Sequence, residues 1–168
     1  MVMPEAAFFF LTLPFAIWAA WGDLKRMKIS NVFNLTLFGV FLVSGLFLVP
    51  LPEYGMRLAI GLAALVVGFV LNARGNLGGG DAKYIAAFLP FVRPEDLSVF
   101  FLVLAMCLLA ALLVHRTARR TAWVRAQAPD WKSWTAQKFP MGLGLSGALS
   151  FYLAMRAFSL PLAAAAAG

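Results

Sequence analysis

The sequence predicts an all-α, polytopic membrane protein with about six transmembrane helices and its N-terminus outside. Of its 168 residues, 62% are hydrophobic and only 12% are charged, whereas about 25% of the residues of a soluble domain are charged. Apolar runs recur from one end of the chain to the other and leave no room for a separate soluble domain. We therefore expect residues 1–168 to form a single membrane-embedded domain.

Six apolar runs define the expected helices, since a bilayer core needs ~20 apolar residues per helix. The first run has no basic residue before it and a basic cluster after it, which is the wrong order for a secretory signal and predicts a retained helix. Ser30 and Asn31 precede the second run and are suited to cap it. The six runs cover residues 6–21, 32–49, 56–71, 82–92, 97–114 and 139–158.

The fourth run is too short to cross a bilayer alone. It has only nine apolar residues, 84–92, and residues 81–83 can add no more than a first turn. Irregular backbone at membrane depth is tolerated only where it is buried in protein or lines water. We therefore expect either a short helix that opens into a wet cavity or a re-entrant segment.

The basic residues predict the orientation. With the N-terminus outside, residues 22–31, 72–83 and 115–138 lie in the cytoplasm and hold 11 of the 14 lysines and arginines, as the positive-inside rule requires. The net charge of +7 is thus explained by membrane topology, and we expect contact with membrane lipids and no nucleic-acid partner. Segment 115–138 mixes arginines with tryptophans, which favours a helix lying on anionic headgroups; gating of a site is the alternative.

Two of the seven acidic residues stand out from the others. Asp23 and Asp81 each lie at the cytoplasmic end of an apolar run, and ionisable residues at membrane depth usually face a bundle interior or a water-filled cavity. The other five fall in segments where solvation is explanation enough: Glu5, Glu53, Glu95, Asp96 and Asp130. Structural alternatives remain open, because Asp81 could be a helix N-cap and Asp23 could pair with Lys25 or Arg26.

Three glycines precede the second aspartate, in the run Leu77-Gly78-Gly79-Gly80-Asp81. Glycine lets another backbone approach closely, and a protease must hold its substrate extended beside its own backbone. We therefore take Gly78, Gly79, Gly80 and the nearby Lys83 as candidate substrate-binding residues. A flexible loop before a capped helix is the structural alternative. No Gly-Lys-Ser/Thr follows, which argues against a nucleotide site.

Two carboxylates that share one water can hydrolyse a peptide bond. Like charges close together cannot both ionise easily, so one becomes the acid and the other the base, and together they activate the water and protonate the leaving group. Nearby Lys25, Arg26 and Lys83 are expected to lower the two pKa values, and desolvation to raise them. Asp23 and Asp81 are thus the candidate catalytic pair.

Other chemistries are poorly provided for. His115 is the only histidine and is expected to be interfacial, and the single cysteine, Cys107, lies in an apolar run as a small buried hydrophobe. No cluster of cysteine and histidine has metal-ligand spacing. We therefore expect no metal and no other cofactor.

These motifs resemble those of the type IV prepilin peptidases, the A24 aspartyl proteases of GxGD type. The segment from Asp23 to Asn31 is similar to the family's first catalytic motif, and Gly78-Gly79-Gly80-Asp81-Ala82-Lys83 is similar to Gly-x-Gly-Asp-x-Lys. Segment 138–142 resembles the Pro-aromatic-Gly element that opens the last helix. Ser30 departs from the usual proline and Met141 from the usual aromatic residue.

The resemblance implies an endopeptidase that removes short basic leaders from pilin-like precursors at the cytoplasmic face of the bacterial inner membrane. The loop between the first two runs is about ten residues long and has no cysteine. It therefore lacks the large Cys-x-x-Cys loop of bifunctional members, and N-methylation is not implied. This minimal form is similar to the CpaA/TadV-like peptidases of tight-adherence (Flp) pilus systems. The rival hypothesis is a small carrier or assembly scaffold that uses the two aspartates as an ion or proton site.

A shared water also makes a geometric prediction. Asp23 ends the first run and Asp81 begins the fourth, so we expect these two helices to be neighbours. Both carboxylates should face one cavity that opens toward the cytoplasm and is lined by residues 78–80.

Overall fold

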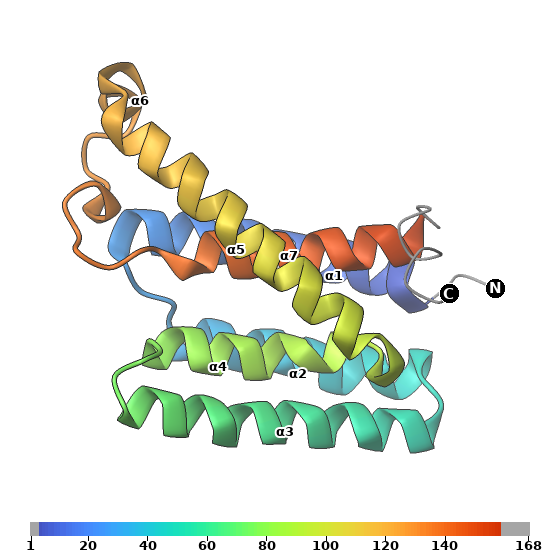
Figure 1. The fold of residues 1–168 in the computed structure, drawn as a ribbon. Helices are drawn as coiled ribbons and strands as arrows, with labels where there is room; N and C mark the ends of the chain where they lie inside the picture. The colour runs from blue at the N-terminus through green and yellow to red at the C-terminus, as the bar shows by residue number, and fades with distance from the viewer. Residues whose placement is uncertain (1–3, 159–168) are drawn as a thin grey trace.

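A computed structural model describes residues 4–158, and the regular elements of this part of the chain are all helices (Figure 1). The predicted all-α class is therefore confirmed. The α-helices are α1 (Pro4–Arg26), α2 (Asn31–Leu48), α3 (Leu51–Ala73), α4 (Gly79–Phe88), α5 (Leu97–Arg120), α6 (Ala122–Gln127) and α7 (Met141–Ala157), and the 3-10 turns are η1 (Leu89–Phe91), η2 (Pro94–Asp96) and η3 (Lys132–Trp134).

Four helices are long and apolar enough to cross a membrane: α1, α2, α3 and the continuous segment of η2 and α5. Only 17% of the residues in the apolar windows of α3 and α5 are buried inside the protein, so the bilayer must cover most of their side chains. Helix α4 has 10 residues and α7 has 17. Both are shorter than these four, and six crossings stay a prediction, as does the outside N-terminus.

The helix ends follow from local chemistry. Ser30 caps α2 as predicted, because its hydroxyl oxygen accepts the backbone N–H of Phe33 at 3.3 Å. Helix α1 ends at Arg26, and the next residue, Met27, has a left-handed φ of 55° that sends the chain toward α2. Helix α5 continues six residues past the expected end at 114, because the apolar run marks the part in contact with lipid and the polar residues that follow still favour a helix.

Helix α4 is a short helix that is buried in protein. It therefore agrees with the first alternative, a short helix, and not with a re-entrant segment. Residues 86–92 of α4 and η1 are all buried, and the chain leaves α4 at the end of the molecule opposite to where it entered (Figure 1). Two glycines of α3 allow this close packing. A Cβ on Gly68 would lie 2.9 Å from the Cβ of Ala82, and one on Gly61 would lie 2.8 Å from Cγ of Pro90.

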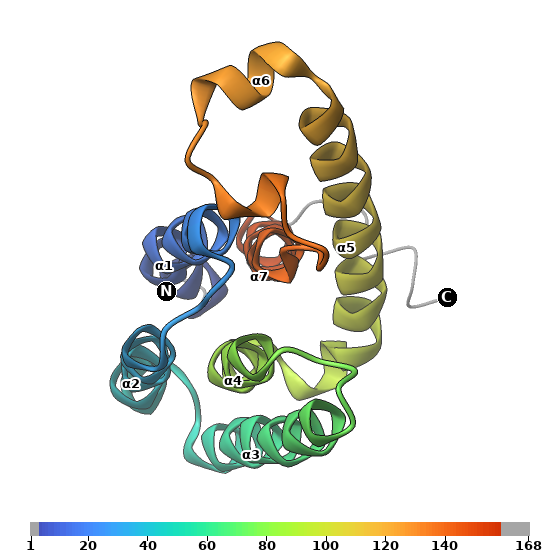
Figure 2. The ribbon, with the colours of Figure 1, turned by 90° about the vertical axis from the view of Figure 1, so that its left-hand side faces the viewer.

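The helices form two groups, which are joined where α1 meets α2, where α7 meets α4 and where α5 meets η2. Helix α7 packs against α1 and α5, and α4 packs against α3 and α2 (Figure 2). Helices α1 and α4 do not pack along their lengths, so the expectation that they are direct neighbours is wrong. The C-terminal end of α1 and the N-terminal end of α4 lie at the same end of the molecule (Figure 1). The connections at that end are 27–30, 74–78 and 121–140.

Two acids expected to be solvated are buried at the opposite end. Glu5 is 7% exposed and lies 3.8 Å from Nη2 of Arg57, which also bonds Glu53 at 2.6 Å and is itself 1% exposed. Asp96 is 4% exposed and pairs with Arg156. The expectation failed for Glu5 and Asp96 because each acid meets a cation that is distant in sequence, and a buried charge is stable only when it is paired.

Segment 115–138 is not one helix, so that part of the expectation is wrong; its place on the membrane surface and the alternative of gating stay predictions. It comprises the end of α5, the short helix α6 and the turn η3, which packs against α1. His115 is buried, not interfacial, because its ring stacks on Trp134 with a centroid distance of 5.5 Å. Cys107 is half-buried against the apolar core.

Candidate active site

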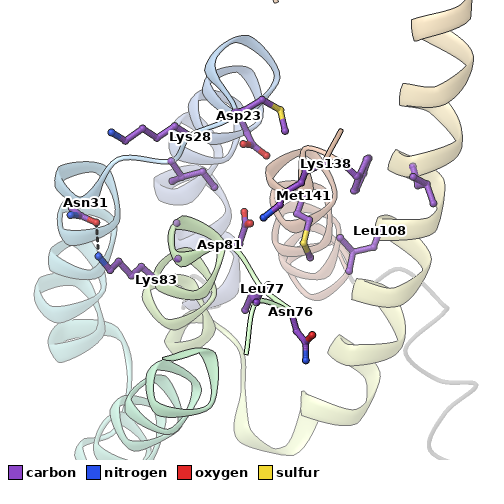
Figure 3. A pocket seen from close by; sticks show the side chains of 18 of the residues that line it. Asp23, Lys28, Asn31, Asn76, Leu77, Asp81, Lys83, Leu108, Lys138 and Met141 are labelled. Atoms are coloured by element: carbon purple, nitrogen blue, oxygen red, sulfur yellow. Dashed lines mark hydrogen bonds between the residues drawn. The ribbon is translucent and has the colours of Figure 1, made fainter. Parts of the chain in front are cut away.

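A cavity of about 890 Å³ opens at the end of the molecule where the three connections meet. Asp23 reaches it from α1 and Asp81 from the first turn of α4 (Figure 3). The glycine run, the α1–α2 connection, the start of α7 and three leucines of α5, Leu108, Leu109 and Leu112, form the rest of its walls. The structure therefore brings both predicted catalytic residues to one cavity, although their helices are not packed together.

Asp23 is 5% exposed and has a defined partner. Its Oδ2 accepts the backbone N–H of Gly142 at 2.7 Å. Gly142 is the second residue of α7, and the N–H groups of a first helical turn lack partners within the helix. Asp23 thus caps α7 from another helix, and the positive end of the α7 dipole stabilises negative charge on its carboxylate.

The glycine at position 142 is required by this contact. A Cβ there would lie 2.8 Å from Cβ of Asp23 and 3.0 Å from Oδ2. Pairing of Asp23 with Lys25 or Arg26 is wrong. Among residues 4–158 no ion pair to Asp23 is formed, and both basic groups lie over the ring of Trp21, at 4.8 and 5.8 Å from its centroid.

Asp81 is the third residue of α4, whose N-cap is Gly78. No side chain caps this helix, so the N-cap alternative for Asp81 is wrong. Burial, and after it the charge of Asp23, raise the pKa of Asp81 to about 6, although the charge of Lys138 opposes the shift. A carboxyl group with this pKa can hold a proton near neutral pH, as a general acid must.

The cation that lowers the pKa of Asp81 is Lys138, and not Lys25, Arg26 or Lys83 as predicted from sequence. Its side chain points into the cavity toward Asp81 (Figure 3). Lys83 points the other way, and its Nζ donates a hydrogen bond to Oδ1 of Asn31 at 2.9 Å. Lys83 therefore lies at the rim of the cavity, where it can contact a bound chain without touching the carboxylates.

The glycine run lines the cavity as predicted, and two of its three members have close neighbours. A Cβ on Gly78 would meet Oδ2 of Asp81, and one on Gly80 would lie 3.2 Å from the carbonyl oxygen of Ile29. A Cβ on Gly79 would make only ordinary contacts, at 3.5 Å or more from Asn72. Side chains are thus excluded where the run passes the carboxylate and the α1–α2 connection.

Sequence reasoning missed Gly142 and Lys138 as members of the site. The motif at 138–142 indicated that this segment matters, but nothing in it indicated contact with Asp23, which is 119 residues away. Lys138 belongs to a basic loop, and the positive-inside rule was explanation enough for its charge. Only the packing of α7 on α1 brings the two residues to the carboxylates.

The fold and the cavity define a membrane protein with two carboxylates at the end of a helical bundle. Comparison with protein families gives a match to the type IV leader peptidase family over residues 10–114, which include Asp23 and Asp81. The chain therefore belongs to the type IV leader peptidase family, as its motifs indicated. Searches of curated proteins and of solved structures return no match.

Proposed function

We propose that the protein is an intramembrane aspartyl endopeptidase in which Asp23 and Asp81 activate one water. The observation that carries this proposal is the meeting of the two carboxylates, from α1 and α4, in one cavity of a leader peptidase family member. The rival carrier hypothesis has no feature of the cavity in its favour beyond the carboxylates themselves.

The surroundings suggest different roles for the two acids. Burial disfavours the charge of both acids, but of the two only Asp23 accepts a backbone N–H from the residues that the structure describes, at the N-terminus of α7, so we assign it as the general base that takes a proton from water. Asp81 has a raised pKa and accepts no backbone N–H of this kind within residues 4–158, so we assign to it the proton that the leaving amine receives. The glycine run then provides backbone at which the substrate can lie extended.

The proposed substrate is a pilin-like precursor with a short basic leader, which is the class that a leader peptidase family implies. The proposed location is the bacterial inner membrane with the cavity toward the cytoplasm. The ends of the helices around the cavity carry most of the basic residues, and the positive-inside rule places such ends in the cytoplasm. The short loop 27–30 offers no second, methylating site.

Cleavage of a precursor by the purified protein tests the proposal. Asp23→Asn and Asp81→Asn should each reduce kcat/KM by at least about 10³-fold, because each removes one of two groups that act together. Asp130→Asn is the matched control, since Asp130 is exposed in the loop after α6 and should leave cleavage unchanged. Near-normal cleavage by either cavity variant would sink the proposal.

A further inference from the structure

A second hollow lies beside the active-site cavity, on the side that faces the membrane. It has a volume of about 470 Å³, and its walls are α2 and α3 with α4 as its floor. We call it the lateral groove. Its apolar lining comes mainly from Leu35, Phe38, Leu58, Leu62, Leu65 and Ala86.

The groove exists because α2 and α3 separate toward the active-site end. Tyr54 holds the two helices together near their connecting turn, where its hydroxyl donates to the carbonyl oxygen of Leu42 at 3.0 Å and its ring stacks on Phe41. Farther along, α4 packs against both helices from one side (Figure 2). The small side chains of Ala86 and Ala87 on α4 leave the space open.

The groove adjoins the active-site cavity. Asn31 and Lys83 line both hollows, and the hydrogen bond between them forms the boundary. From this boundary the groove follows α2 from Asn31 to Phe38, which is two helical turns or roughly 10 Å. A chain that passes the carboxylates can therefore continue into the groove without leaving the protein surface.

One polar atom in the groove has no partner. Asn34 is 5% exposed and lines the groove. Its Nδ2 donates to the carbonyl oxygen of Gly80 at 3.4 Å, but its Oδ1 accepts no hydrogen bond from any group within residues 4–158. A buried acceptor without a donor is costly, and a lipid acyl chain has no donor to offer. The first N–H groups of a peptide helix do lack partners, and a turn of the buried Asn34 amide toward the groove would bring its Oδ1 to one of them.

We infer that the lateral groove binds the apolar, helical segment of the substrate that follows the scissile bond. This inference rests on the proposed peptidase function and names where the rest of the substrate lies. A segment in lipid must be helical to satisfy its own backbone, and exposed leucines on both walls, Leu35 at 72% and Leu62 at 64%, provide its apolar contacts. The bond from Asn34 to Gly80 links an occupied groove directly to the glycine run.

Two probes test the inference by kinetics. The long probe is a peptide with a basic leader, a cleavage segment and an apolar segment of about 20 residues, and the short probe ends just after the cleavage segment. Leu35→Trp and Leu62→Trp should raise the KM of the long probe about tenfold and leave cleavage of the short probe unchanged. Val43→Trp and Val66→Trp are matched controls, because both residues are exposed on the same helices outside the groove. Equal effects of the groove variants on both probes, or no effect, would overturn the inference.

A crosslinking measurement separates this inference from the proposed function, since it needs no cleavage. A photoreactive residue replaces Leu62 or, as the control, Val66 in the Asp81→Asn protein, reconstituted in lipid with the long probe. Crosslinking at position 62 and not at 66 supports the groove. Crosslinking at neither position, or equally at both, contradicts it and leaves lipid as the occupant. If the unmodified protein cleaves neither probe, the proposed function fails, and crosslinking still decides whether the groove binds the probe.

Discussion

At the scale of single residues, the site depends on glycines that hold the carboxylates in place. The backbone N–H of Gly142 reaches Asp23 only because position 142 has no side chain, and Gly78 leaves the same kind of space for Asp81. These glycines therefore act on the reacting groups by permitting close approach, which is a requirement different from the conformational freedom usually assigned to glycine.

Gly142→Ala should reduce kcat about 10²-fold, because the added Cβ forces Asp23 to move and small displacements of a catalytic group cost about that much. Gly147→Ala is the matched control in the same helix, since a Cβ there meets nothing within 4 Å. Activity and thermal unfolding in detergent should be measured on both variants. The account of Asp23 fails if the two variants have equal activity, or if activity falls only in proportion to folded protein.

The pH dependence of cleavage should report Asp81. Its pKa of about 6 means that the carboxyl is protonated below pH 6 and ionised above it. If Asp81 is the acid, kcat/KM declines as the pH rises through about 6. Lys138→Met removes a positive charge that favours the carboxylate, so the declining limb should move to higher pH, whereas Lys138→Arg should leave it in place. A limb that moves to lower pH in Lys138→Met would contradict the assignment.

At the scale of helices, α4 carries Asp81 and is therefore essential to the site. It is also the helix whose structure was hardest to predict from the sequence. It is too short to be held by the bilayer, so the protein holds it by close packing on α3 and α2. The nearest approach is at Gly68, where a Cβ would lie 2.9 Å from the Cβ of Ala82. Because Ala82 follows Asp81 directly, any shift at this contact reaches the carboxylate.

Gly68→Ala should therefore reduce both stability and activity. We expect a loss of about 1–3 kcal/mol in the free energy of unfolding, as for other overpacked contacts, together with a lower kcat. Gly55→Ala on the same helix meets nothing within 4 Å and should be neutral or stabilising by up to about 1 kcal/mol. Chemical unfolding in detergent beside the cleavage assay makes the comparison. Unchanged stability and activity in Gly68→Ala would show that the contact between Gly68 and Ala82 does not hold α4 in position.

At the scale of the whole molecule, the sequence predicted the helical class, the apolar runs and the end at which the connections gather. These properties depend on the composition of each segment and on the length of its apolar run, and both can be read from the segment alone. Long-range pairing was not predictable in this way. The ion pairs of Glu5 and Asp96, the burial of His115 and the bond between Asp23 and Gly142 all join residues that are not neighbours in the chain. The expectations of solvated acids and of an interfacial His115 failed for that reason.

The same contrast holds for the candidate site. The two aspartates and the glycine run were predictable because acids beside apolar runs are costly and conspicuous. The prediction that both carboxylates face one cavity agrees with the structure. The prediction that α1 and α4 pack directly on each other does not, since α7 contacts both of these helices and forms part of the cavity wall. The lateral groove has no signal in the sequence, because it arises from the separation of α2 and α3 around α4.

The central claim is that Asp23 and Asp81 act as one unit on one water. The most direct test is the double variant Asp23→Asn/Asp81→Asn, measured beside the two single variants on the long precursor probe. Groups that act together give losses that do not add, so the account predicts that the double variant is no slower than the worse single variant. Losses in kcat/KM that multiply in the double variant would mean that the two carboxylates act independently, and would contradict the shared-water mechanism.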